Sequence, residues 1–301
     1  MRRHRISGLL LLVATLLSMS GLAAAQTYNA ASDFSASQNP TPKGWSYGQT
    51  TSRGSLPFLP FLVNYSTYDG LDIWTNYGTI VFHNATTTIV KHDCCNPLPP
   101  GGLGLHPGYF GENAVVRWTA PAKGLYKVTA TFSGLDFGGQ TGTTTDVAVL
   151  HTGSNGTTQL FAGDIVGFGC HDAQSFSGTV SVLAGDTIDF TVGYGGDGNF
   201  DSDGTVLDAV ITAESQVLTT DVTNLISGSN LSQQQKSQLN ALRSAIVNSL
   251  ASGNKTAAIR DLKTLVLDVG LLMWSTPSLV PAALGDRLIT DANEAIAMLS
   301  S

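Results

Sequence analysis

The feature that most constrains the fold is a series of segments within residues 105–214 in which apolar and polar residues alternate. Successive side chains of a β-strand point to opposite faces, so a period of two predicts strands that are buried on one face. No helical segment separates them, which favours two antiparallel sheets packed face to face, a jelly-roll-like β-sandwich. The inward-facing residues of the clearest segments are Tyr126, Val128, Ala130 and Phe132, then Phe176, Val180 and Val182, then Ile188, Phe190 and Val192. The turn residues 183–186 predict that the last two segments form a hairpin.

The hydrophobic pattern becomes helical near residue 215. Apolar residues then recur every three or four positions, which predicts amphipathic helices. They are Leu239, Leu242, Ile246 and Leu250, then Ile259, Leu262, Val266 and Val269, then Leu284, Leu288, Ala292, Ala295 and Leu299. Ser232 is predicted to cap the first of these helices, Gly253 to end it, and residues 275–277 to end the second. We therefore expect a separate bundle of three or four helices over residues 217–301, joined to the sandwich by a short linker near residues 214–218.

The first 25 residues have the organisation of a secretory signal peptide. Arg2, Arg3 and Arg5 precede an apolar run at residues 8–17, and residues 23–25 offer an A-x-A cleavage site. The expected organisation is therefore a signal peptide over residues 1–25, a sandwich over 26–214 and a helical domain over 217–301. We expect an exported protein that works outside the cell, with no segment long enough to span a membrane.

Three cysteines, Cys94, Cys95 and Cys170, would then lie in an oxidising compartment. The expectation is one disulfide, between Cys95 (or Cys94) and Cys170. Neighbouring His and Asp residues allow a zinc or copper site as the alternative, but adjacent cysteines seldom bind one ion together, so the disulfide is favoured.

Oxygen-bearing side chains crowd the segment that follows the alternating strands. They are Asp197, Asn199, Asp201, Asp203 and Asp208. Alternate residues of a loop can face one cation, and Ca²⁺ accepts six to eight oxygen ligands. The spacing partly matches an EF-hand loop, but Ser202 stands where that loop needs glycine and the flanking segments are strands. The prediction is a structural Ca²⁺ site, with a solvated turn as the alternative.

Aromatic side chains near loops are candidates for sugar binding, because the apolar faces of sugar rings stack on exposed rings. The candidate ligand-binding residues are Trp45, Trp74, Tyr77 and Tyr109. Packing in the core is the alternative for each of them, since most aromatic residues are buried. Trp118 shares the strand parity of Val116 and is predicted to be a core residue.

Several strings in the first part of the chain are distinctive in combination. They are GWSYG at 44–48, LHPG at 105–108, GENAVVRWTAPAKGLYKVTATFSGLD at 111–136 and VLAGDTIDFTVGYGGDGNFDSDGTVLDAVI at 182–211. Residues 28–213 resemble, through these strings, a β-sandwich domain of exported bacterial proteins, many of which carry PEP-CTERM sorting tails. The resemblance implies a secreted, non-catalytic sandwich akin to carbohydrate-binding modules. The sequence contains no Pro-Glu-Pro motif, so we expect no sorting of the PEP-CTERM kind.

The second part of the chain carries a different resemblance. The strings are NLISGSNLSQQQKSQLNALRSAI at 224–246, SGNKTAAIRDLKTLVLDV at 252–269 and LGDRLITDANEAIAML at 284–299. Residues 217–301 resemble the FIMAH domain, a helical module of bacterial surface proteins and secreted enzymes. This resemblance implies an accessory, interaction or spacer role, which includes a protein partner.

Composition and motifs narrow the function further. The net charge of −7 argues against nucleic acid, because binding phosphates needs a cationic face. No H-E-x-x-H helix or phosphate-binding glycine loop is present, and Glu112 and Glu214 are the only glutamates of the sandwich. We therefore expect a non-catalytic module that binds a glycan or another cell-surface component. The alternatives are a structural or matrix protein without sugar recognition and, less favoured, a polysaccharide hydrolase.

Overall fold

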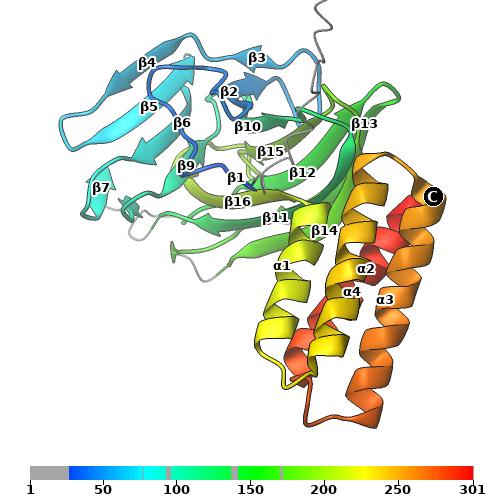
Figure 1. The fold of residues 1–301 in the computed structure, drawn as a ribbon. Helices are drawn as coiled ribbons and strands as arrows, with labels where there is room; N and C mark the ends of the chain where they lie inside the picture. Colours follow the sequence, from blue (N-terminus) through cyan, green and yellow to red (C-terminus); the bar gives the residue numbers. More distant parts are fainter. Residues whose placement is uncertain (1–26, 77, 93–95, 137–141, 170–171, 301) are drawn as a thin grey trace, which may run out of the picture.

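A computed structural model describes residues 27–76, 78–92, 96–136, 142–169 and 172–300 of the 301-residue chain. It confirms the expected fold class, an antiparallel β-sandwich followed by a helical bundle (Figure 1). The predicted signal peptide at residues 1–25 lies outside the described residues, as do all three cysteines, so the predicted disulfide of Cys170 with Cys95 (or Cys94) is untested.

The sandwich consists of two antiparallel sheets. In order across the first, sheet A, the strands are β14 (Gln174–Val182), β11 (Gly124–Gly134), β16 (Thr205–Ala213), β9 (Leu103–His106), β6 (Thr79–Asn84), β5 (Leu71–Asn76) and β4 (Val63–Ser66), and β1 (Thr27–Asn29) also pairs with β16. In order across the second, sheet B, they are β13 (Gly156–Asp164), β12 (Asp146–Gly153), β15 (Thr187–Gly193), β10 (Asn113–Thr119), β2 (Trp45–Thr50) and β3 (Leu59–Pro60). A separate ribbon joins β7 (Val90–His92) to β8 (Asn96–Leu98).

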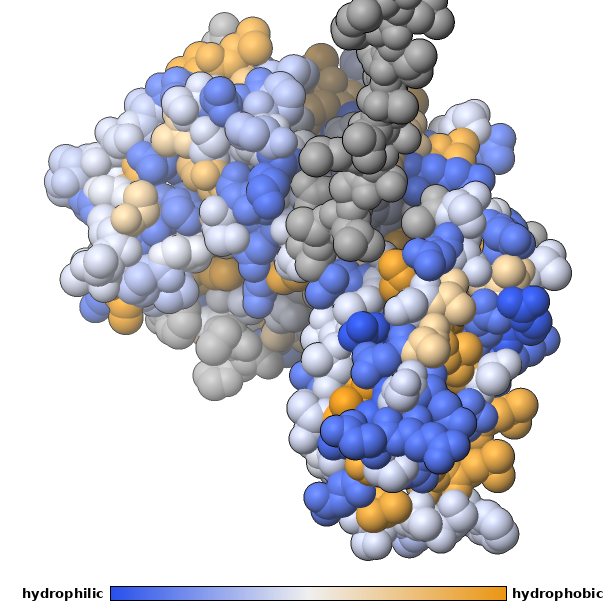
Figure 2. All heavy atoms as spheres, viewed as in Figure 1, coloured by the Kyte–Doolittle hydropathy of each residue, from blue (hydrophilic) through white to orange (hydrophobic). Residues whose placement is uncertain are grey.

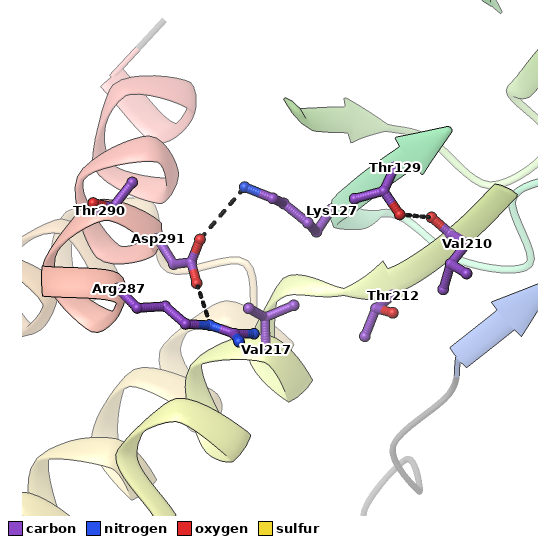
Figure 3. A pocket seen from close by; sticks show the side chains of 8 residues that line it. All are labelled: Lys127, Thr129, Val210, Thr212, Val217, Arg287, Thr290 and Asp291. Carbon is purple, nitrogen blue, oxygen red and sulfur yellow. Dashed lines mark hydrogen bonds and ion pairs between the residues drawn. The ribbon is translucent and has the colours of Figure 1, made fainter. Parts of the chain in front are cut away.

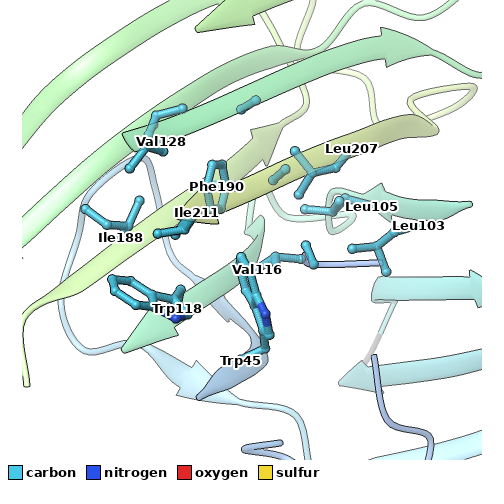
Figure 4. Close-up of a cluster of buried hydrophobic side chains, with 14 of the residues drawn as sticks. Trp45, Leu103, Leu105, Val116, Trp118, Val128, Ile188, Phe190, Leu207 and Ile211 are labelled. Atoms are coloured by element: carbon cyan, nitrogen blue, oxygen red, sulfur yellow. The ribbon is translucent and has the colours of Figure 1, made fainter. Parts of the chain in front are cut away.

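The inner faces of the two sheets form the main hydrophobic core (Figure 4). The predicted alternation of β11 is confirmed, since Tyr126 and Val128 are buried in this core while Thr129 faces outward. Trp118 is fully buried, as predicted, and its ring packs between those of Tyr28 and Tyr126. Burial of these apolar faces is the main favourable contribution to the stability of the sandwich.

The predicted hairpin across residues 183–186 is wrong. β14 pairs with β11 at the edge of sheet A, whereas β15 lies between β10 and β12 in sheet B. The turn therefore carries the chain from one sheet to the other. Burial explains the difference, because six of the seven β15 residues are buried, as suits a central strand, while β14 is exposed along one face.

Four helices follow the sandwich: α1 (Glu214–Ser227), α2 (Gln233–Ala251), α3 (Lys255–Ser275) and α4 (Ala282–Ser300). The predicted linker at residues 214–218 does not exist, since α1 begins at the residue after β16 ends. The predicted helix ends are confirmed: Ser232 forms a capping box with Gln235, Gly253 has a φ of 71°, and α3 ends at Ser275. Within the described residues, no helix is long and apolar enough to cross a membrane.

The bundle packs against the outer face of sheet A. α1 lies against β11 and β16, and α4 lies against β14 (Figure 1). The bundle has its own hydrophobic core, built from all four helices, and Leu125 of β11 is the sandwich residue that packs against it. The main core of the sandwich and the core of the bundle thus meet across a polar sheet face. A smaller cluster in the sandwich contains Leu71, Ile73, Phe82, Val90, Leu98 and Leu135.

Candidate functional site

One end of the sandwich gathers aromatic side chains on two loops. Residues 107–112 follow β9 and residues 194–204 precede β16, and β9 and β16 are paired at that end. Tyr109 is 63% exposed and Phe110 is 80% exposed. The Tyr109 ring lies edge-on to Phe110 at 4.9 Å and to Phe200 at 5.1 Å between ring centroids. We call Tyr109, Phe110 and Phe200 the aromatic platform.

Backbone contacts hold the platform in place. Within the first loop, Gly108 N donates to Glu112 O at 2.8 Å, and Phe110 N donates to Glu112 Oε2 at 3.1 Å. Gly111 has a φ of 91°, and a Cβ there would lie 2.9 Å from the ring of Tyr194. The close approach of Tyr194 to this glycine therefore locks the two loops together, which is consistent with pre-formed binding sites.

The structure corrects two of the predicted ligand-binding residues. Trp45 and Trp74 are buried in the core, where their rings cannot reach a sugar. Trp74 Nε1 donates to the carbonyl of Ser35 at 2.7 Å, which satisfies its polar atom in the interior. Tyr77 lies outside the described residues, so Tyr109 alone of the four candidates is placed at the surface.

The acidic loop lies beside the platform, because Phe200 belongs to the same loop. Asp203 is fully buried, and its Oδ1 accepts hydrogen bonds from Thr144 N at 2.8 Å and Thr144 Oγ1 at 3.0 Å. The same Thr144 hydroxyl is 3.1 Å from Asp197 Oδ2. One hydroxyl proton cannot serve both carboxylates, so the pair needs either a proton on one acid or a nearby cation.

Burial raises the pKa of Asp203 from its ordinary value to about 7, against the lowering effect of the hydrogen bonds from Thr144. Its Oδ2 is buried and has no hydrogen-bond partner among the described residues. A cation bound in place of the Asp203 proton would therefore stabilise the ionised form of this buried carboxyl group.

The predicted five-residue calcium ligand set does not assemble as a whole. Asp197 and Asp203 converge on Thr144. Within the surface turn, Asn199 N donates to Asp197 Oδ1 at 3.1 Å and Asp201 N donates to Asn199 Oδ1 at 3.2 Å, so Asp201 takes part through its backbone. Asp208 lies within β16, exposed and paired in register with Thr131. Among the described residues, no three His, Cys, Asp or Glu side chains are close enough to hold one metal ion. The alternating spacing suggested convergence, but strand β16 begins at Thr205 and carries Asp208 away.

A second polar site lies where the bundle meets sheet A. A cavity of about 410 Å³ opens between β11, β16, α1 and α4 (Figure 3). Lys127 of β11 contacts Glu294 at 2.5 Å and Asp291 at 3.4 Å, and Arg287 contacts Asp221 at 3.1 Å. Two cations thus pair with three acids across the contact, so we interpret the site as an ionic joint between the sandwich core and the bundle core.

Buried acids of this joint have raised pKa values. Burial and the nearby charge of Asp291 raise the pKa of Glu214 to about 8. Burial and a hydrogen bond with Asp291 raise the pKa of Asp221 to about 7. No sequence pattern indicates this cluster, because its members come from β11, α1 and α4, and only the docking of the bundle brings them together.

One motif with a catalytic spacing is also explained by the fold. Residues 44–48 read GWSYG, which matches the G-x-S-x-G spacing of a nucleophile elbow. Ser46, however, is the second residue of β2 and lies in register with Arg117 of β10, and no helix follows this strand. The strand-turn-helix geometry that such an elbow requires is therefore missing here.

No protein-family model matches the chain, and no curated protein matches it. Similar solved structures include a family 61 carbohydrate-binding module in complex with β-1,4-galactotriose, with 10% identity over 50% of this chain and 99% of that chain and a TM-score of 0.27. A family 35 carbohydrate-binding module from Paenibacillus barcinonensis shows 14% identity over 62% of this chain and 98% of that chain, with a TM-score of 0.25.

The active domain of tailspike protein 4 of bacteriophage CBA120 shows 13% identity over 56% of this chain, with a TM-score of 0.27. This chain spans 19% of the tailspike chain. No ligand or residue role is transferred from these likenesses.

Proposed function

We propose that the protein binds a glycan through the aromatic platform, without catalysis and outside the cell. The observation that carries the proposal is the exposure of Tyr109 and Phe110, two large rings held on a braced loop beside Phe200. Aromatic rings that are exposed to water lack the stabilisation that burial provides. A sugar ring that stacks on them would bury their apolar faces.

The surroundings of the platform add polar partners. Asp197 and Asp201 are exposed, and Asn199 is partly exposed, on the same loop as Phe200. Carboxylate and amide oxygens accept hydrogen bonds from sugar hydroxyls, whereas they repel carboxylates and sulfates. The proposal therefore favours neutral glycans over acidic ones.

The test is a glycan array with the mature protein, followed by calorimetric titration of each hit. Tyr109→Ala and Phe110→Ala are each expected to weaken binding about tenfold, which corresponds to the loss of one stacking contact. Tyr68→Ala is the matched control, since Tyr68 is fully exposed and follows β4, at the other end of sheet A. Full affinity in a Tyr109→Ala/Phe110→Ala double variant would refute the site.

Two other outcomes point to the rival functions. Silence across neutral and acidic glycans, with retention on a matrix of the organism's own surface proteins, favours a structural or adhesion role. Release of reducing ends from a bound polysaccharide would identify a hydrolase and overturn the non-catalytic part of the proposal.

We also propose that a structural Ca²⁺ assists the acidic loop, through Asp203 and Asp197. The support is the unpartnered, buried Oδ2 of Asp203 and the hydroxyl that faces two carboxylates at once. Ca²⁺ would supply the positive charge that this pair lacks, and loop carbonyls could complete its coordination.

A further inference from the structure

The outer face of α3 carries an apolar stripe that the bundle does not use. Leu267, Leu271 and Trp274 are 65%, 59% and 83% exposed. They are spaced by four and three residues, so they lie along one side of the helix. Figure 2 shows hydrophobic side chains gathered at the lower right edge of the bundle, where Figure 1 places α3. We call these three residues the α3 stripe.

Gly270 lies beside the stripe, within the helix. A Cβ on Gly270 would meet nothing within 4 Å, so no contact inside the described chain requires a glycine there. Glycine is unfavourable in a helix interior. A glycine next to Leu267 and Trp274 leaves a notch into which another helix can pack closely.

Charge is distributed unevenly along the same face. Arg260 and Lys263 are exposed in the N-terminal half of α3, and the stripe occupies its C-terminal half. A parallel helix of the same kind would therefore set cation against cation. An antiparallel arrangement of two α3 helices places the cationic half of each helix against the apolar, aromatic half of the other.

From this pattern we propose that two copies of the chain associate through α3, packed antiparallel across a two-fold axis that passes near residues 268 and 269. In that register, Leu267 lies level with the partner's Gly270, and the leucines of the two copies interleave. Trp274 lies level with the partner's Lys263 on the same side of the helix, which allows a cation–π contact at each end.

The register has one unfavourable feature, which makes it testable. Asp268 is exposed at the side of the stripe, so the two copies place their Asp268 carboxylates near each other at the rim. Replacing Asp268 by asparagine should therefore tighten the association by about twofold at low salt and have little effect at high salt. An unrelated partner helix would not show this dependence.

The contact is small: Lys263, Leu267, Leu271, Trp274 and a glycine on each copy. The association should therefore be weak, with a Kd on the order of tens of micromolar. Sedimentation velocity of the mature chain should show the mass rising from one chain toward two with concentration. Leu271→Glu and Gly270→Gln should both hold the protein monomeric, the second by filling the notch. Leu62→Glu is the matched control, because Leu62 is also an exposed leucine but lies between β3 and β4.

Tryptophan fluorescence gives an independent readout. Trp45, Trp74 and Trp118 are buried, so Trp274 is the tryptophan that a water-soluble quencher reaches. Quenching should be strong in dilute protein and fall as the concentration rises, and Leu271→Glu should abolish the fall. Thermal unfolding of each variant checks that the bundle still folds.

Two outcomes would overturn the proposal. One is a mass of a single chain at millimolar concentration, with Trp274 open to quencher throughout. The other is protection of Trp274 by phosphatidylcholine vesicles while the protein stays monomeric, which would identify the stripe as a membrane-binding surface. Neither result bears on the glycan proposal, which uses loops of the sandwich.

Discussion

Glu214 is the first residue of α1, and it is buried where that helix leaves sheet A. Its Oε2 is 3.4 Å from the Thr179 hydroxyl, and its Oε1 has no hydrogen-bond partner among the described residues. Because its pKa is raised to about 8, the folded protein holds a proton that the unfolded chain releases near the ordinary value of 4.5. The free energy of unfolding should therefore fall as the pH rises through this window, and the stability is largest on the acidic side.

Glu214→Gln removes this titration with little change of shape. The variant should match the wild type near pH 5, where the folded-state acid is neutral in any case. Near pH 9 it should be more stable by about 2 kcal/mol or more, because the wild type then carries a buried charge. Urea unfolding at the two pH values measures the difference, with the exposed Asp164→Asn as control. A difference that does not change with pH would contradict the prediction.

Asp203 offers the corresponding test of the calcium proposal. Ca²⁺ competes with the proton on a group whose pKa is about 7, so millimolar Ca²⁺ should raise Tm more at pH 8 than at pH 6. Asp203→Asn should abolish the gain, whereas Asp208→Asn should keep it, since Asp208 points away from the loop on β16. Equal melting curves with Ca²⁺ and with a chelator at pH 8 would contradict the calcium proposal.

At the scale of elements, periodicity could predict which face of a strand is buried but not which strand lies beside it. β14 and β15 have the same alternation and are four residues apart, yet they belong to different sheets. Alternation reports burial, and pairing depends on contacts far away in the sequence. Helix ends were predictable because caps are local: Ser232 and Gly253 act within one turn of the chain.

The same limit explains why the sequence predicted the exposure of Tyr109 correctly and that of Trp45 and Trp74 wrongly. Tyr109 sits in a Pro- and Gly-bounded loop, and such a loop usually lies at the surface. Trp45 and Trp74 lie in strands, where the opposite sheet decides their exposure, and that sheet cannot be read from local sequence. Phe110 and Phe200 were not predicted as binding residues, because a phenylalanine is more often a buried core residue than an exposed one.

The capping box of α2 gives a prediction at this scale. Ser232 Oγ accepts from Gln235 N at 3.3 Å, and Gln235 Oε1 accepts from Ser232 N at 2.8 Å. Ser232→Ala leaves the Gln235 amide without its partner, so unfolding of the bundle should become easier by about 1 kcal/mol. Ser244→Ala, an exposed change within the same helix, should not destabilise. Thermal unfolding followed by helical circular dichroism measures both variants, and equal loss in both would argue against the cap.

Over the whole molecule, β16 connects the two polar sites. Its start at Thr205 adjoins the acidic loop and the platform, and its end at Ala213 passes directly into α1. At about 3.3 Å per residue, the strand separates the two by roughly 25 Å. The main core of the sandwich and the core of the bundle are also separate clusters. The joint can therefore be weakened without disturbing the loops that we propose bind sugar.

Lys127→Met tests this separation. The change leaves Asp291 and Glu294 without their shared cation, while the methionine keeps the length of the side chain. Breaking a fully buried ion pair costs several kcal/mol, but Glu294 is partly exposed, so docking of the bundle should weaken by about 2 kcal/mol. Calorimetry should then show the bundle unfolding at a lower temperature than the sandwich, and glycan affinity should not change. Lys123→Met, an exposed lysine in the turn before β11, is the control. If both cores lose stability together, the ionic joint is part of one cooperative unit, and the description of two cores that meet across a polar face is wrong.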